Sequence, residues 1–169
     1  MKADIVLLGK AISGGVYPVS AVLASHSVMS VIEPGTHGST YGGNPLGCAV
    51  AIAALQVITD ENLISEAARK GELLRTGLNA LKSTCKGIKE VRGRGLLNAV
   101  VVDEEALGGR SAWELCLLLK EKGVLAKPTH ENIIRLAPPL VVSDEMVEKA
   151  VRVFGEALNE LVSTGRARR

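Results

Sequence analysis

A lysine, Lys10, directly follows a short apolar run, residues 4–9, that ends in Gly9. The run has the pattern of a buried strand inside an α/β sheet. Desolvation at the end of such a strand favours the neutral, nucleophilic form of an amine, which is what Schiff-base formation with an aldehyde cofactor requires. The ordinary alternative is a lysine whose charged end reaches water along its aliphatic stem. This pattern alone leaves both interpretations open.

Two neighbouring hydroxyl side chains, Ser39 and Thr40, lie in a glycine-dense loop over residues 35–45. Such a loop can cradle a phosphate dianion, although serine and threonine in glycine loops also serve as turn residues. Asn44 suits an N-cap and Pro45 the first helical position, which predicts a helix from Pro45 to about residue 58. Because that stretch is uncharged, we expect it to be buried on most sides.

A third candidate, Arg135, lies inside the apolar run of residues 133–136. An arginine in a strand that otherwise belongs to the core needs an anionic partner or a pocket. A structural pair with a carboxylate and a fork that binds a substrate carboxylate are both open at this point. Arg92 and Arg94 could bind anions, but a solvated strand end explains them at least as well. Lys127 and His130 are lesser candidates, since loop structure explains them better than chemistry does.

The elements that must position these residues fall into two parts. Residues 4–9 and 19–24 predict two neighbouring strands joined by the turn at residues 13–15. From about residue 85 short strands and helices alternate, which predicts a small α+β domain with helices on one side of a sheet. Its expected strands cover residues 88–92, 96–102, 124–127 and 133–136. One expected helix begins at the capping box Ser111-x-x-Glu114 and ends at Gly123, and the last begins at Ser143. Before this domain, an apolar stripe over residues 67–81 predicts a further helix.

Composition excludes several other classes of protein. The 169 residues are 47% hydrophobic and 22% charged, which is typical of a folded chain. A net charge of +2 with 2% aromatic residues provides neither the basic stripe nor the stacking platform of a nucleic-acid-binding protein. No apolar run reaches the roughly 18 to 20 residues of a membrane span. The three cysteines, Cys48, Cys85 and Cys116, have no metal-ligand spacing and predict reduced, mostly buried thiols, so no metal is expected.

Two segments taken together resemble a known family. Residues 4–15, DIVLLGKAISGG, are similar to the lysine segment of the class III aminotransferases, and residues 37–46, HGSTYGGNPL, resemble the second signature of that family. Within the class, residues 91–99, 125–130 and 134–140 look most like ornithine aminotransferases. The resemblance covers nearly the whole chain.

This resemblance implies an α/β enzyme of the pyridoxal-phosphate (PLP) transferase fold type I. Residues 1–60 would form the end of the PLP-binding large domain, and residues 61–169 the C-terminal α+β small domain with its linking helix. Lys10 would bind the cofactor covalently and carry the proton between substrate and cofactor. Ser39 and Thr40 would reach the cofactor phosphate of a neighbouring subunit in a homo-oligomer. Arg135 would bind the substrate carboxylate.

The implied reaction transfers the δ-amino group of L-ornithine to 2-oxoglutarate, so amino acids and 2-oxo acids are the expected substrates. The family's acidic residue for the pyridine nitrogen, its stacking aromatic ring, its main phosphate turn and the carboxylate that pairs with Arg135 would all precede residue 1. We therefore expect a C-terminal portion with little or no activity alone, because the cofactor ring would lack its electronic partner.

Two alternatives remain open: an acetylornithine or other ω-amino-acid aminotransferase, and a non-catalytic fragment that docks on a full-length subunit. The expected compartment is the cytoplasm as the chain is written, or the mitochondrial matrix if a transit peptide precedes it.

Overall fold

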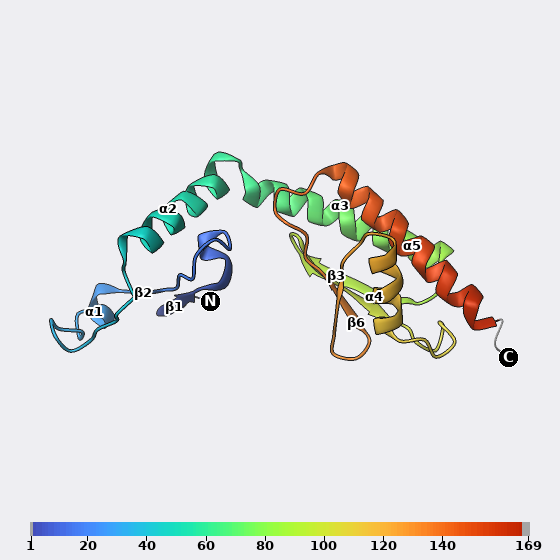
Figure 1. Ribbon diagram of the computed structural model, residues 1–169, viewed down its shortest axis with the longest axis horizontal. Helices are drawn as coiled ribbons and strands as arrows, with labels where there is room; N and C mark the ends of the chain where they lie inside the picture. The colour runs from blue at the N-terminus through green and yellow to red at the C-terminus, as the bar shows by residue number, and fades with distance from the viewer. Residues whose placement is uncertain (1, 167–169) are drawn as a thin grey trace. The chain divides into compact units, whose positions relative to one another are not determined.

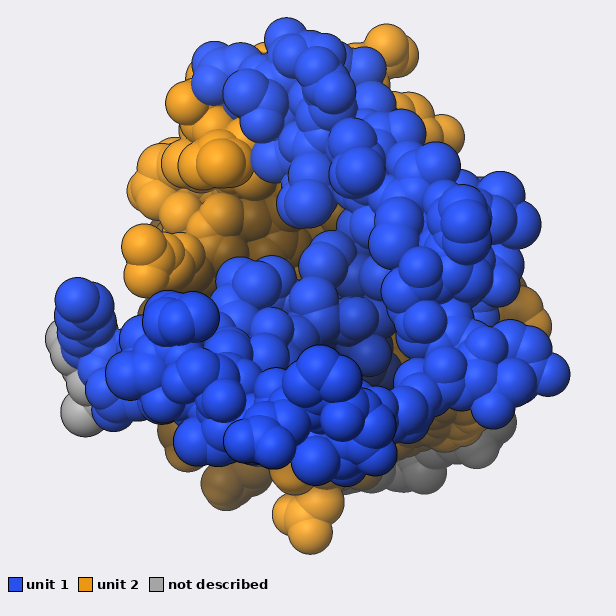
Figure 2. Space-filling model, turned by 90° about the vertical axis from the view of Figure 1, so that its left-hand side faces the viewer, with its two compact units in different colours: residues 1–62 blue, residues 63–169 orange. Residues whose placement is uncertain are grey.

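The computed structural model describes the backbone of residues 2–166 and the side chains of residues 2–163. The chain divides into two compact units, with the division between Asn62 and Leu63 (Figure 2). Among the described residues, no single helix is long and apolar enough to cross a membrane. The consecutive helices Pro45–Asp60 and Leu63–Thr84 meet that length and composition test only when they are taken together across the break between them.

The first unit is built around a two-stranded antiparallel sheet and one long helix. The strands pair from Ile5 with Ala24 to Leu8 with Ala21, which confirms the expected neighbouring strands. The elements are β1 (Ile5–Leu8), the 3-10 helix η1 (Lys10–Ser13), β2 (Ala21–Ala24), α1 (His26–Met29) and α2 (Pro45–Asp60) (Figure 1).

Helix α2 begins at the position that the sequence predicts. The side-chain oxygen of Asn44 accepts a hydrogen bond of 2.8 Å from the backbone N–H of Gly47, and Pro45 occupies the first turn. This cap satisfies one of the amide groups that a helix start leaves without a partner. The segment that follows β1 packs on α2, because a Cβ on Gly14 would lie 3.6 Å from the Cβ of Ala54.

The expected burial of β1 and α2 is wrong for this chain. All four residues of β1 are exposed, with Leu7 at 75%, and α2 buries only Gly47 and Ala51 while Ile52 is 62% exposed. An apolar run indicates a surface that some layer covers, but it does not say which residues supply that layer. The described residues of the first unit do not supply one.

The second unit is an antiparallel four-stranded sheet with the strand order β3-β4-β6-β5, together with three helices. The expected α+β pattern is confirmed, including the capping box in which Ser111 and Glu114 bond each other's backbone N–H groups. The elements are α3 (Leu63–Thr84), β3 (Ile88–Arg94), β4 (Leu97–Val102), α4 (Ala112–Glu121), β5 (Lys127–Thr129), β6 (Ile133–Leu136) and α5 (Asp144–Arg166).

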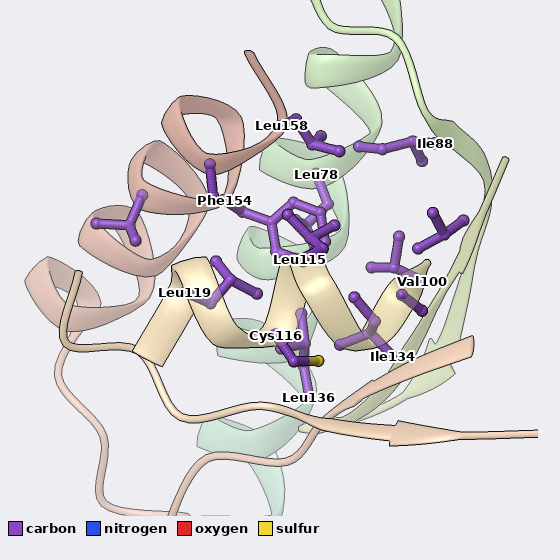
Figure 3. Packing of buried hydrophobic residues seen from close by; sticks show 14 of the residues in the cluster. Leu78, Ile88, Val100, Leu115, Cys116, Leu119, Ile134, Leu136, Phe154 and Leu158 are labelled. Carbon is purple, nitrogen blue, oxygen red and sulfur yellow. The ribbon is translucent and has the colours of Figure 1, made fainter. Parts of the chain in front are cut away.

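One face of this sheet is covered and the other is open. On β4, Val100 and Val102 are fully buried while Leu97, which points to the opposite face, is exposed, as the period of two in a strand requires. Figure 3 shows the core on the covered side, where Phe154 of α5 and Leu115 of α4 lie beside Leu78 of α3. This core holds the strands in place, and the same strands carry the side chains of the open face.

Strand β5 begins at Lys127, three residues later than expected. The backbone N–H of Val124 instead donates to the carbonyl of Leu119 at 2.8 Å, as part of the chain reversal after α4. An amide used in this way cannot join the ladder with β6, and Leu125 is left exposed.

The hairpin between β3 and β4 is held against α3 by a close approach of two backbones. A Cβ on Gly71 would lie 1.9 Å from the carbonyl oxygen of Gly95, so only glycine fits there. Arg75, one turn later on α3, donates to that same carbonyl at 3.0 Å and to the Oδ1 of the buried Asn98 at 2.8 Å. These contacts fix the position of the hairpin on the helix.

The cysteines differ from the expectation in one case. Cys85 and Cys116 are buried free thiols, and burial raises the pKa of the Cys116 thiol to about 11. Cys48 is exposed, because it lies on the uncovered surface of α2.

Candidate active site

Lys10 stands at the end of β1 with its backbone in the left-handed region, at a φ of 57°. A residue with a Cβ pays a steric penalty in that conformation, and such strain tends to gather at functional positions. No feature of the amino-acid sequence predicts this conformation. The Lys10 side chain is exposed, because the described residues of the first unit leave β1 uncovered. The role of Lys10 as a cofactor lysine stays a prediction.

The turn after Lys10 is fixed by a buried hydroxyl. Ser13, at the end of η1, is almost fully buried and its hydroxyl donates to the carbonyl of Tyr17. The backbone N–H of Tyr17 donates back to the Ser13 hydroxyl oxygen at 3.3 Å. Gly14 and Gly15, both at positive φ, complete the turn that the sequence predicts. These contacts define the conformation of the turn that follows Lys10.

Ser39 and Thr40 lie in the loop that leads into α2. The Ser39 hydroxyl oxygen accepts from the backbone N–H of Gly42 at 2.8 Å, which shapes the loop and leaves the hydroxyl hydrogen free to donate elsewhere. Asn44 extends this scaffold by donating to the carbonyl of Tyr41 at 2.7 Å. Within residues 2–62, the Thr40 hydroxyl makes no hydrogen bond, and none joins Lys10 to Ser39 or Thr40.

Arg135 belongs to the second unit and lies on the open face of its sheet. It pairs across the ladder with Ala99 on one side and Lys127 on the other. Its side chain is exposed, and it forms no ion pair with any side chain in residues 63–163. The alternative in which Arg135 is a structural partner of a carboxylate in its own unit is therefore wrong.

The structure brings two lesser candidates beside Arg135. Arg92 pairs with Ala99 on the outer side of β4, so Arg92, Ala99, Arg135 and Lys127 form one cross-strand row. Sequence alternation places each of these residues on a strand face, but only the register shows that the faces coincide. The contact between Arg75 and Asn98 is also not predictable from the sequence pattern, because it joins residues 23 positions apart.

These side chains offer an amine, two hydroxyls and a guanidinium group. An amine can attack a carbonyl carbon, hydroxyls can donate to a phosphate, and a guanidinium group can hold a carboxylate through two parallel hydrogen bonds. The described residues contain no cluster of three His, Cys, Asp or Glu side chains arranged to hold a metal ion.

Comparison with known proteins gives consistent results. The chain is 58% identical over 161 residues to the ornithine aminotransferase of Emericella nidulans, a match that spans 95% of this chain and 35% of that protein. It is 54% identical over 159 residues to the mitochondrial ornithine aminotransferase of Oryza sativa, with 94% and 34% covered. Among solved structures, an acetylornithine aminotransferase from Elizabethkingia anophelis matches with a TM-score of 0.85 and 51% identity, over 95% of this chain and 40% of that one.

The chain thus spans about a third of the length of the curated relatives that it matches. The family model described as aminotransferase class-III matches residues 1–158, which is nearly the whole chain. The lysine segment, the glycine-rich loop and the strand with Arg135 all lie inside that match. The chain belongs to the class III aminotransferase family and has the α/β fold of that family.

Proposed function

We propose that this chain is part of an ornithine aminotransferase, which transfers the δ-amino group of L-ornithine to 2-oxoglutarate. The observation that carries the proposal is Lys10, an amine in a strained left-handed conformation at the end of β1. It lies in a chain that is 58% identical to an ornithine aminotransferase. Backbone strain at Lys10 is consistent with a functional position, because the surrounding structure must maintain it.

The proposed cofactor is pyridoxal phosphate, and the donor set fits that molecule. The fit rests on an exposed amine at Lys10 and on the Ser39 hydroxyl, which is oriented by its bond from Gly42. Thr40 provides a second hydroxyl with no hydrogen-bond partner in residues 2–62. When bound, this cofactor supplies an aldehyde carbon and an electron-withdrawing ring. Ser39 and Thr40 would hold its phosphate across a subunit boundary.

In this proposal Lys10 performs two tasks. Its Nζ atom holds the cofactor between turnovers, and once a substrate amine takes its place, the same atom moves a proton to and from the substrate carbon. A positioned amine that is free to act as a general base suits the second task. Gly14 and Gly15, both at positive φ, let the chain reverse immediately after η1.

Arg135 is proposed to bind a substrate carboxylate. Its guanidinium group is exposed, and no carboxylate in residues 63–163 occupies it. A planar fork of donors matches a carboxylate in two parallel hydrogen bonds, which fixes the orientation of the substrate as well as its affinity.

We further assign residues 1–60 to the end of a PLP-binding large domain, and residues 61–169 to the small domain. The exposed apolar side chains of β1 and α2, such as Leu7 and Ile52, support this assignment. Large contiguous apolar surfaces are rarely left in water. We propose that the rest of a longer chain and a second copy in a homo-oligomer cover them.

Two other functions remain candidates. An acetylornithine aminotransferase is favoured by the 51% identity to the Elizabethkingia structure. A docking fragment without activity is favoured by the uncovered surface of the first unit. For the compartment, the Oryza relative carries the word mitochondrial in its name and the Emericella relative does not, so we propose the matrix only for a form with a transit peptide.

The test is a chimera in which this chain replaces the matching region of the Emericella nidulans enzyme. With PLP and 2-oxoglutarate, we expect glutamate to form from L-ornithine at a higher kcat/KM than from N-acetylornithine. The Lys10→Ala chimera should lose roughly 1,000-fold or more of the activity, as enzymes do when a covalent catalytic group is removed. The chain alone should give almost no turnover.

A preference for N-acetylornithine would move the assignment to the second candidate. A chimera that folds, binds PLP and turns over neither donor would support the docking fragment instead. Lys2→Ala is the matched control, because it removes another exposed lysine of the first unit without touching η1.

A further inference from the structure

Three cations lie in one row across the entire sheet of the second unit. Arg92 on β3 pairs with Ala99 on β4, Ala99 pairs with Arg135 on β6, and Arg135 pairs with Lys127 on β5. Residues that are direct partners in adjacent strands point to the same face of a sheet. All three charged side chains are exposed, so this is the open face.

The spacing of the row is set by the ladder. Adjacent strands are about 4.8 Å apart, so Arg92 and Arg135 are roughly 10 Å apart at the backbone, with only the methyl group of Ala99 between them. Lys127 and Arg135 are direct neighbours, with Cβ atoms about 5 Å apart. In this row the small side chain of Ala99 therefore lies between two long cationic side chains, those of Arg92 and Arg135.

Compensation for these charges within the unit is slight. Glu90 pairs with Val101 two positions along, and its carboxylate lies 3.5 Å from Arg92, in a pair whose two side chains are about half exposed. Such an exposed pair contributes little. Arg94, opposite Leu97, adds a fourth cation to the same face. Neither Arg135 nor Lys127 forms an ion pair with a side chain of residues 63–163.

Like charges directly opposite each other destabilise a sheet. The pairing of Arg135 with Lys127 is therefore unfavourable until an anion joins them. Lys127 faces Arg135 across the β5–β6 ladder, and Arg92 lies on the same face two strands away. An anion held by Arg135 is therefore attracted by both of these cations.

We infer that Lys127 and Arg92 are positioning residues for Arg135, and that the three together form a binding strip for the carboxylate end of an amino-acid or oxo-acid substrate. This inference rests on the proposed function, in which Arg135 binds that carboxylate. Lys127 has the larger effect, because it is the direct neighbour of Arg135. Arg92 acts from two strands away, because Ala99 lies between it and Arg135.

The strip is tested without cofactor or turnover, by titrating the 15N-labelled chain of residues 1–169 with glutarate and following the amide signals of Ala99 and Arg135. We expect saturable shifts for the wild type, weakened at high salt because exposed charges are screened. Lys127→Gln should weaken binding roughly 3-fold, the effect of one unit charge at about 6 to 7 Å when water surrounds the exposed side chains. Lys127→Arg should restore it.

A charge reversal makes the test sharper. In Lys127→Glu a carboxylate faces Arg135 directly and captures its guanidinium group, so saturable binding should disappear. The matched control is Lys149→Gln on α5, which removes the same charge from another exposed lysine and should leave binding within twofold of the wild type. Unchanged amide spectra away from the sheet confirm that each variant is folded.

Three results would overturn the inference: no saturable binding by the wild type, equal binding by Lys127→Gln and the wild type, or equal losses in Lys127→Gln and Lys149→Gln. Tighter binding of inorganic phosphate than of glutarate at matched ionic strength would also overturn it, by assigning the strip to a phosphate group. Because PLP is absent from this experiment, its outcome is independent of whether the chimera described above is active.

Discussion

The guanidinium group of Arg75 on α3 donates a hydrogen bond of 2.8 Å to the side-chain oxygen of Asn98 on β4. Asn98 is only 2% exposed and its amide also donates to the carbonyl of Gly95 at 3.1 Å. One buried side chain therefore ties the helix to the strand and to the turn between β3 and β4. Ala99, the next residue on β4, lies in the row that carries Arg92, Arg135 and Lys127 on the open face.

Replacing Asn98 with alanine should destabilise the second unit. A buried hydrogen bond to a charged group is lost, and Arg75 keeps only its bonds to Gly95 and Glu72, so we expect a loss of roughly 1.5 to 3 kcal/mol in the free energy of unfolding. Urea denaturation measures this loss. The control, Asn79→Ala, removes an exposed asparagine from α3 and should change stability by less than about 0.5 kcal/mol. Equal effects would contradict the proposed role of the Asn98 contacts.

The capping box of α4 should make stability depend on pH. The backbone N–H of Ser111, and then the guanidinium group of Arg110, hold the pKa of the Glu114 carboxyl below its ordinary value of 4.5. Because the pKa is lower in the folded chain, the charged carboxylate stabilises the fold above about pH 4.5. That contribution is lost as the pH falls through the folded pKa.

The stability difference between wild type and Glu114→Gln should therefore be larger at pH 7 than at pH 3, as measured by urea denaturation at both values. Glu148→Gln on α5 is the control, since Glu148 is exposed and forms no ion pair in residues 63–163. A difference for Glu114→Gln that does not change with pH would show that the carboxylate charge is not what the cap uses.

The turn between β5 and β6 contains a position at which glycine should increase the stability of the fold. His130 and Glu131 have φ angles of 47° and 55°, in the left-handed region that costs a residue with a Cβ roughly 1 to 2 kcal/mol. Part of the gain from Glu131→Gly is offset by the greater entropy of glycine in the unfolded chain, so we expect stabilisation of about 0.5 to 1 kcal/mol. Thermal and urea unfolding both measure it.

The same substitution at a helical position should have the opposite sign. Glu148→Gly in α5 should cost about 1 kcal/mol, because glycine disfavours a helix interior. If Glu131→Gly destabilises the chain as much as Glu148→Gly does, the left-handed conformation at the turn carries no strain.

Local signals predicted much of this fold. The cap at Asn44 and the capping box at Ser111 depend on residues within a few positions of one another, and both are confirmed. The strand expected over residues 96–102 is found as β4, and the helix expected from Ser143 is found as α5.

The burial of a strand and the register between strands depend on partners distant in sequence, and local patterns do not predict them. An apolar run such as residues 5–8 shows that a surface is made for burial, but it does not show which residues bury it. The described residues of the first unit leave β1 exposed for this reason. The position of Lys127 opposite Arg135 follows from the ladder register, which the sequence does not specify because β5 starts later than its apolar pattern suggests.

The central claim, that Lys10 is the lysine that binds the cofactor, is tested most directly by chemical mapping of the chimera with the Emericella nidulans enzyme. The chimera is loaded with PLP, treated with borohydride to fix the covalent lysine bond, digested and analysed by mass spectrometry. We predict one cofactor group per chain, on the peptide that contains Lys10, and its loss in Lys10→Ala with the fold retained. A fixed cofactor on a different lysine, with Lys10 unmodified in an active chimera, would contradict the account.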